Sequence, residues 1–108
     1  MVNSIVVVGR AGQDPDMKYF ESEKVKTTFS LAVNRWDGRT KEEITDWFNI
    51  EVWNKQAEFA GEYVKKGRMV AVEGHLTVSK WKGADGEMNE RFFINATNVK
   101  LIGGKKDE

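Results

Sequence analysis

The chain has 108 residues, which suits one domain with its own buried core, and 17 basic residues balance 17 acidic ones. This balance argues against a surface that is basic throughout, although it leaves room for a local basic groove. The chain has no cysteine and one histidine, His75, so disulfides and thiolate metal sites are excluded and histidine-based catalysis has little scope.

No run of about 18 apolar residues is present, so we predict no membrane span. The first residues, MVNSIVVVGR, lack the basic flank of a signal peptide, which favours a cytoplasmic protein. We expect one folded domain over residues 1–102 and a short polar end, GGKKDE, at residues 103–108.

The first third of the chain predicts strands separated by turns. Residues 4–9 (SIVVVG) are apolar almost without interruption, which indicates a strand buried on both faces. Residues 9–15 (GRAGQDP) form a predicted turn, and residues 17–20 continue as a short strand. Residues 25–34 (VKTTFSLAVN) predict a long strand, and the polar residues 36–45 (WDGRTKEEIT) predict a loop.

The next strand is predicted over residues 46–53, within the stretch DWFNIEVWNK. Its apolar residues Phe48, Ile50 and Val52 are two positions apart, so they share one face and should point into a core. Trp47 and Trp53 have the opposite parity, which they share with an amide and a carboxylate. Two of the largest apolar side chains are therefore predicted on the polar face of the strand.

A single helix is predicted over residues 55–67 (KQAEFAGEYVKKG). Ala57, Ala60 and Val64 recur at helical spacing, and Phe59 and Tyr63 are four residues apart. Two lysines, Lys65 and Lys66, are expected in its last turn, where cations suit the helix dipole, and Gly67 is the expected stop.

The remaining sequence predicts two more strands. Residues 69–81 form the first, with a bulge or bend at Gly74, and residues 91–102 form the last. Residues 82–90 (KGADGEMNE) are the predicted hairpin loop between them. The order β-β-β-α-β-β predicts an all-β fold, a five-stranded Greek-key barrel of the OB-fold type with one helix between strands 3 and 4.

All four tryptophans share parity with mostly polar positions of the predicted strands: Trp36, Trp47, Trp53 and Trp81. They could fill a second small core or a subunit interface. The alternative is stacking, because every nucleic-acid base has a π-face and gains about 1–3 kcal/mol on an aromatic ring. Oligosaccharides also stack on aromatic rings, but the sequence offers no set of polar partners that converges on one. We therefore favour the stacking of bases.

Basic residues close to the tryptophans favour a polyanion as the ligand. The candidates are Arg35, Lys55, Lys66, Lys80 and Lys82. Other chemistry has little support, because GRAG lacks the pattern of a phosphate-binding loop and His75 has no nucleophile or carboxylate at a recognisable spacing. We predict no catalytic residues, no metal site and no cofactor.

Several stretches resemble, in order and spacing, the bacterial single-stranded DNA-binding protein family, especially its short cyanobacterial-type members. They are NSIVVVGRAGQDPDMKY at residues 3–19, followed by FSLAVNR, DWFNIEVWNK, YVKKG, VEGHL and KW. The resemblance implies sequence-independent binding and protection of single-stranded DNA in replication, recombination and repair, in a cytoplasmic, nucleoid-associated protein. It also implies a homotetramer in which the first strand and the GQDP turn build subunit contacts.

The resemblance assigns roles to individual residues. It implies that Trp36, Trp47, Trp53 and Trp81 stack on bases and that Lys55, Lys66 and Lys80 contact phosphates. The chain also departs from the family: Asn49, Thr77 and Ser79 stand where well-known members carry arginines, and Phe48 stands where some carry a histidine tied to assembly. The three missing arginines put the strength of phosphate contact, and its salt sensitivity, in question.

The end of the chain is another departure. Family members usually close on an acidic tip that recruits repair and replication proteins, whereas this sequence stops at GGKKDE. We therefore do not expect recruitment through such a tail. Two other functions stay open from the sequence: an RNA-binding OB protein, and an OB module without a nucleic-acid ligand whose tryptophans lie in an interface.

Overall fold

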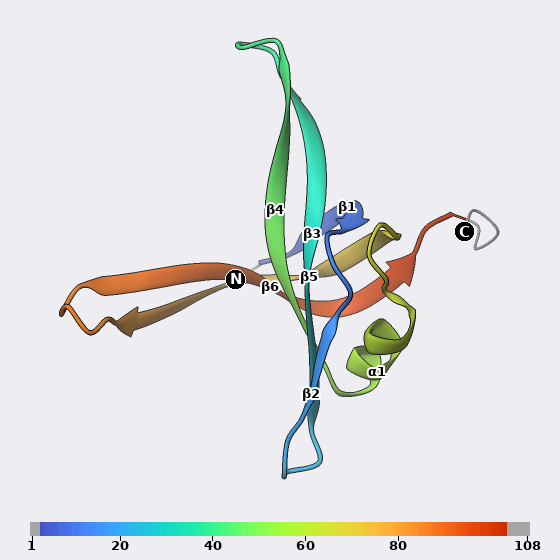
Figure 1. The fold of residues 1–108 in the computed structure, drawn as a ribbon, viewed down its shortest axis with the longest axis vertical. Coiled ribbons are helices and arrows are strands. Elements are labelled where there is room, and N and C mark those ends of the chain that lie inside the picture. The colour runs from blue at the N-terminus through green and yellow to red at the C-terminus, as the bar shows by residue number, and fades with distance from the viewer. Residues whose placement is uncertain (1–2, 104–108) are drawn as a thin grey trace.

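A computed structural model describes residues 3–103 and contains six strands and one helix in that range (Figure 1). Their bounds in chain order are β1 Ile5–Ala11, β2 Asp16–Tyr19, β3 Val25–Asp37, β4 Glu42–Trp53, α1 Asn54–Tyr63, β5 Met69–Lys82 and β6 Met88–Leu101. Of the predicted polar end, only Gly103 belongs to the described residues; the rest lies outside them.

The strands close into a barrel. The order of hydrogen-bonded neighbours is β1-β5-β6-β4-β3, and β1 then pairs with β3 at Arg10 and Ala11 to complete the circle. The short β2 extends the free edge of β3, and β4 and β6 run parallel to each other. This closed five-stranded barrel, with one helix between β4 and β5, confirms the predicted OB-type fold.

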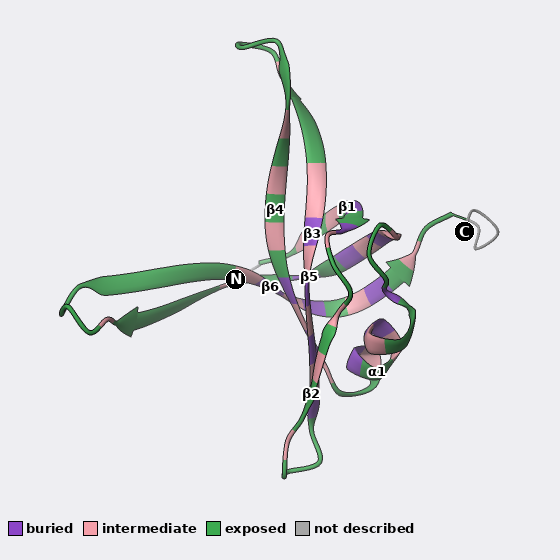
Figure 2. Cartoon of the chain, in the orientation of Figure 1, coloured by how far each residue is buried: buried purple, intermediate pink, exposed green. Residues whose placement is uncertain are grey.

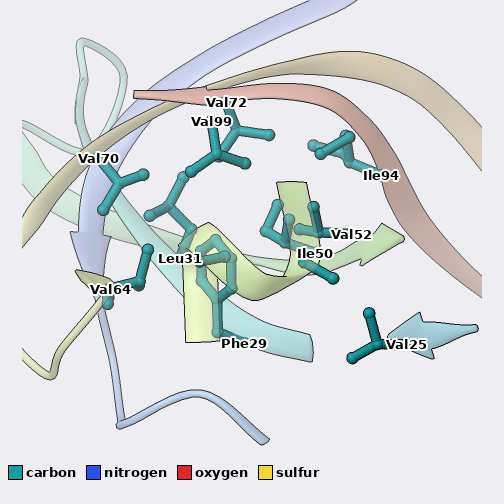
Figure 3. Packing of buried hydrophobic residues seen from close by; sticks show 14 residues of the cluster. Val25, Phe29, Leu31, Ile50, Val52, Val64, Val70, Val72, Ile94 and Val99 are labelled. Atoms are coloured by element: carbon teal, nitrogen blue, oxygen red, sulfur yellow. The ribbon is translucent and has the colours of Figure 1, made fainter. Parts of the chain in front are cut away.

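Alternate residues of the strands fill the interior of the barrel. Phe29 and Leu31 on β3 lie opposite Ile50 and Phe48 on β4, so all four point to the same side. Figure 3 shows Phe29, Leu31 and Ile50 together with side chains from β5 and β6. The buried cluster comprises Ala11, Val25, Phe29, Leu31, Ile50, Val52, Ala57, Ala60, Val64, Val70, Val72, Ile94, Ala96 and Val99. Phe48 is half-buried at its edge, so the predicted inward face of the DWFNIEVWNK stretch is confirmed.

The helix covers one end of the barrel. As predicted from their spacing, Ala57, Ala60 and Val64 are fully buried, and the rings of Phe59 and Tyr63 lie 5.1 Å apart. One buried polar side chain joins the helix to the sheet, because the Thr27 hydroxyl on β3 donates a hydrogen bond to the Ala57 carbonyl at 2.6 Å.

The predicted end of the helix is wrong. The helix stops at Tyr63, so Lys65 and Lys66 lie beyond its last turn. The cause is tertiary pairing, because the Gly67 N–H donates to the Ala11 carbonyl at 2.8 Å and the Ala11 N–H donates to the Arg68 carbonyl at 2.9 Å. The segment after Tyr63 therefore pairs with the end of β1 and does not continue as helix.

The irregularity predicted at Gly74 is confirmed, although the extra residue is on the partner strand. Glu73 pairs with Asn98 and Gly74 pairs with Ala96, which leaves Thr97 of β6 as the bulged residue. A Cβ at Gly74 would lie 2.2 Å from the Asn95 carbonyl oxygen, so the close approach of β6 requires glycine there. Because the insertion is in β6, the alternation of β5 continues unbroken.

Two long hairpins extend from the barrel as arms (Figure 1). The β3–β4 arm includes most of residues 36–45, which were wrongly predicted as a loop, because β3 reaches Asp37 and β4 begins at Glu42. The β5–β6 arm likewise shortens the predicted 82–90 loop, since β5 ends at Lys82 and β6 begins at Met88. Backbone pairing holds these polar segments together as strands, and side-chain hydrogen bonds such as that of Thr45 to Asn34 add to it on the β3–β4 arm.

The outer parts of the arms bury neither face, as the green colouring in Figure 2 shows. Leu76 and Val78 of β5 have the parity of the buried Val70 and Val72, but both are exposed because the β5–β6 arm has already left the barrel at these positions. The prediction that β1 is buried on both faces is also wrong within the chain. Val6 and Val8 are 63% and 48% exposed, since only one side of a barrel wall can face its core.

Candidate nucleic-acid interface

The β3–β4 ladder gathers three tryptophans on one side. Trp53 lies opposite Lys26, Trp47 opposite Ala32 and Trp36 opposite Glu43. These positions have the opposite parity to the buried Phe29 and Ile50, so their side chains point away from the core. We call this side of β3, β4, β5 and β6 the outer face.

The fourth tryptophan lies on the same outer face. Ile94 of β6 pairs with Ile50 on β4 and with Leu76 on β5, so these three residues share the inner side. Because β5 alternates regularly beyond this point, Trp81 has the parity of the outward residues. The prediction that all four tryptophans share parity with outward positions agrees with this register, although Trp36 and Trp81 lie out on the two arms.

Trp53 is half-buried at the edge of the barrel and lies in a stack. Its ring lies 5.7 Å from that of Phe20, with an interplanar angle of 21°. The ammonium of Lys26 lies 5.6 Å from the Trp53 ring, and that of Lys18 lies 5.4 Å from the Phe20 ring. The Trp53 ring is therefore held in a stack that carries two cations, Lys26 at Trp53 and Lys18 at Phe20.

Trp47 is 61% exposed and lies against the β1–β2 turn. A Cβ built on Gly12 would lie 2.5 Å from Trp47 Cζ3, so the ring packs directly on the glycine backbone. Trp36, at 66% exposure, and Trp81, at 47%, are similarly open to solvent. These three rings present large apolar surfaces that the barrel leaves uncovered.

A groove of about 500 Å³ runs over the outer face of β2, β3 and β4. Its floor includes Asn49 and Glu51, the two outward residues that separate Trp47 from Trp53 on β4. Trp47 and Trp53 are six strand residues apart, or about 20 Å, which is far enough for several nucleotides to lie between them. Its lining residues are Gln13, Asp16, Lys18, Lys26, Thr28, Phe29, Ser30, Asn49, Ile50, Glu51 and Arg91.

The predicted basic residues are not gathered in this groove. Arg35 has the inner-face parity, opposite to that of Trp36, and its Nε donates to Asp46 Oδ2 at 2.7 Å. That hydrogen bond, together with the Asp46 charge, raises the pKa of Arg35. Lys80 and Lys82 likewise have the opposite parity to Trp81 on β5.

The other two predicted lysines flank the helix. Lys55 is exposed in the first turn of α1, two residues beyond Trp53. Lys66 is exposed after α1, where its backbone N–H donates to Asp14 Oδ1 at 2.9 Å. Of the two, only Lys55 lies close in sequence to a tryptophan.

Sequence reasoning missed the residues that lie next to Trp53 and in the groove. Lys26 carried a usable signal, because it shares parity with the outward residues of its strand. Phe20, Lys18 and Arg91 carried none, since their positions depend on how β2 and β6 pair with the central strands. Among the described residues, no group of three or more His, Cys, Asp or Glu side chains could hold a metal ion, and no helix is long and apolar enough to cross a membrane.

Comparison with known proteins agrees with this geometry. The Single-strand binding protein family matches residues 2–102. "Single-stranded DNA-binding protein 1" of Synechocystis sp. is 47% identical over 98% of this chain and 88% of its own length. The protein of the same name from Nostoc sp. is 43% identical over 98% and 87%.

A solved structure, the Plasmodium falciparum SSB complex with ssDNA, is also similar. Its TM-score is 0.85 at 30% identity, covering 95% of this chain and 97% of that one. The relatives are single-stranded DNA-binding proteins, a family of binding proteins that are not enzymes. The sequence profile, the relatives and the shared barrel lead to one conclusion: the chain belongs to the single-strand binding protein family.

Proposed function

We propose that this protein binds single-stranded DNA without regard to sequence and protects it during replication, recombination and repair. The observation that carries the proposal is the outer face, where all four tryptophans point outward and a groove with basic residues lies between the Trp47 and Trp53 positions of β4. Trp36, Trp47, Trp53 and Trp81 would stack on bases, each contributing about 1–3 kcal/mol. Such stacking tolerates every base, so affinity would depend little on sequence.

Phosphates would be met by cations around these rings. The residues proposed from the sequence are Arg35, Lys55, Lys66, Lys80 and Lys82; Lys18 and Lys26 join them on the strength of their contacts with the Phe20–Trp53 stack. Because Arg35 is already paired with Asp46, we expect it to contribute less than the lysines do. Each phosphate contact releases counterions, so binding should weaken as salt rises.

We further propose a homotetramer located in the cytoplasm and associated with the nucleoid. The support for assembly is β1, where Val6 and Val8 stand exposed side by side on the wall of the barrel. Such a row of apolar side chains is the kind of surface that a second copy covers. Partner recruitment through an acidic tail is not part of the proposal, because the residues that would bear on it lie outside the described range.

Titration with an oligo-thymidine strand, followed by tryptophan fluorescence, tests the proposal. We expect strong quenching that weakens with salt and changes little when an oligo-cytidine strand of equal length replaces it. Unchanged emission at low salt would overturn DNA binding. Light scattering on the same samples should give four times the chain mass, and a monomer mass would overturn only the tetramer.

RNA is the closest competing ligand, because stacking does not depend on the 2′-hydroxyl. Competition between DNA and RNA strands of matched sequence would separate the two. We expect DNA to displace RNA at equal concentration, and the reverse order would assign the protein to RNA. In the alternative without a nucleic-acid ligand, Trp47→Ala together with Trp53→Ala would dissociate the assembly; our proposal predicts an intact assembly with lost affinity.

A further inference from the structure

The centre of the groove lacks a cation on its own two strands. Between the Trp47 and Trp53 positions, β4 presents Asn49 and Glu51, and the facing positions of β3 carry hydroxyls. Lys18 and Lys26 lie at the Trp53 end, beside the Phe20–Trp53 stack. A strand of DNA that crosses from one tryptophan to the other would therefore meet a carboxylate at mid-groove.

Arg91 reaches this point from the neighbouring strand. It belongs to β6, lines the same groove, and its side chain is 52% exposed. Its Nη2 lies 3.5 Å from Glu51 Oε2, and its guanidinium carbon lies 5.7 Å from the centre of the Phe93 ring. The side chain is thus held on one side by a carboxylate and on another by an aromatic ring.

The contact with Arg91 accounts for the presence of a charged residue at position 51. Its side chain is only 13% exposed, so its charge is costly unless it is paired. The contact with Arg91 engages one of the five N–H donors of a guanidinium, which leaves others for a second anion. A half-exposed arginine held in this way is suited to a phosphate that passes over the groove.

We propose that Arg91 is a phosphate-contacting residue of the groove and that Glu51 is the positioning residue that holds it there. The inference rests on the single-stranded DNA binding proposed above and adds to it the cation at the centre of the groove. The bound class is the phosphodiester of a single strand, and the contact carries no base preference.

Arg91→Met tests the contact because it removes the charge and keeps an unbranched side chain. With oligo-thymidine, we expect a deficit of about fivefold or more at about 0.05 M salt that shrinks by a factor of about 2.5 or more at about 0.2 M, because each lost contact lowers the salt slope by about 0.7. Arg91→Lys should restore most of the slope. Lys100→Met, at the far end of the same strand, loses the same charge and should bind as the unaltered chain does.

Glu51→Gln tests the positioning role in two backgrounds. In the unaltered chain it should weaken binding, because Arg91 loses its anchor. In the Arg91→Met chain it should strengthen binding, because only a repulsive charge is removed. Equal factors in both backgrounds would show that Glu51 does not act through Arg91 and would overturn its role.

The outcomes separate this inference from the function on which it rests. If the unaltered chain does not quench with DNA, the proposed function fails. If it binds and Arg91→Met binds equally well at every salt concentration, only the role of Arg91 fails. A deficit that Lys100→Met reproduces would also overturn it, since any lost charge would then suffice. Thermal unfolding of each variant confirms that the barrel is intact.

Discussion

The barrel and the two arms are built from the same strands, yet their side chains have different surroundings. On β5, Val70 and Val72 are fully buried, whereas Val78 is 40% exposed on the arm. On β3, Leu31 is fully buried, whereas Arg35, four residues later on the same face, is exposed. The alternation of side chains continues along each strand. On the arms, however, no other part of the barrel covers the inner face of these strands.

This difference separates stability from binding. The free energy of folding comes from the barrel, where apolar side chains leave water, and the arms add paired backbone with little burial. An arm can therefore carry a large aromatic side chain toward a ligand at small cost to folding. Trp53 combines both roles, because its half-buried ring stacks on Phe20 while its side chain lies on the outer face.

Leu31→Ala should have the largest effect, on the barrel side of the comparison. The side chain is fully buried among residues of several strands, so its loss leaves a cavity and should lower the free energy of unfolding by about 2–5 kcal/mol. Urea unfolding followed by circular dichroism measures the change.

Trp36→Ala is the matched truncation on an arm. We expect the free energy of unfolding to change by less than about 0.5 kcal/mol, because most of the Trp36 side chain is already exposed to water. A loss comparable with that of Leu31→Ala would show that the β3–β4 arm packs on something, and the division between barrel and arm would not hold.

Trp53→Ala and Trp81→Ala should sharpen the comparison. Each removes one stacking ring and should weaken binding of oligo-thymidine by about 1–3 kcal/mol. Only Trp53→Ala should also reduce stability, because it breaks the stack with Phe20 and the contact with Lys26. Fluorescence titration and urea unfolding on the same preparations separate the two effects, and equal stability of both variants would place Trp53 among the arm residues.

The sequence predicted the barrel better than the arms for a physical reason. Residues such as Ile50 and Val52 recur with period two because one face of their strand is buried, and that pattern is readable. Residues 36–45 form strands that bury neither face, so their polar sequence matched a loop. The pairing of two exposed strands leaves no apolar period behind.

The candidate site divides along a similar line. The outward tryptophans were predictable because parity within one strand decides their face. The predicted parity of Trp81 is correct because the extra residue of the bulge, Thr97, lies in the partner strand. Lys18 and Arg91 were out of reach, since they enter the groove through pairings between distant segments. The face on which a strand residue lies follows from the sequence of that strand. The residues that line a groove depend on which distant segments pair.

Thr27→Val should have a moderate effect on the barrel. The substitution keeps the shape but removes the hydroxyl that joins β3 to the Ala57 carbonyl of α1, which should cost about 1 kcal/mol of stability. Thr45→Val is the matched change on the arm, where the hydroxyl donates to Asn34 Oδ1 at 2.7 Å in an exposed position. We expect less than about 0.5 kcal/mol there, because water replaces the lost partner. Urea unfolding of the pair checks both values, and equal losses would contradict the assignment of stability to the barrel.

The smallest expected effect lies at the tip of the β3–β4 arm, where Asp37 Oδ1 accepts the backbone N–H of Arg39 at 3.0 Å. This hydrogen bond is the main reason why the pKa of Asp37 is below the ordinary 3.8. A carboxyl whose pKa is lowered by folding stabilises the tip above its ordinary pKa, and the contribution is lost as pH falls through the lowered value. The Arg39 amide resonance should therefore titrate with a midpoint below that of a free aspartate, and Asp37→Asn should abolish the transition. A midpoint at or above the ordinary value would contradict the turn geometry.

Because Asp37 is far from the barrel, global unfolding should not follow this titration, and that independence tests the separation of arm from barrel.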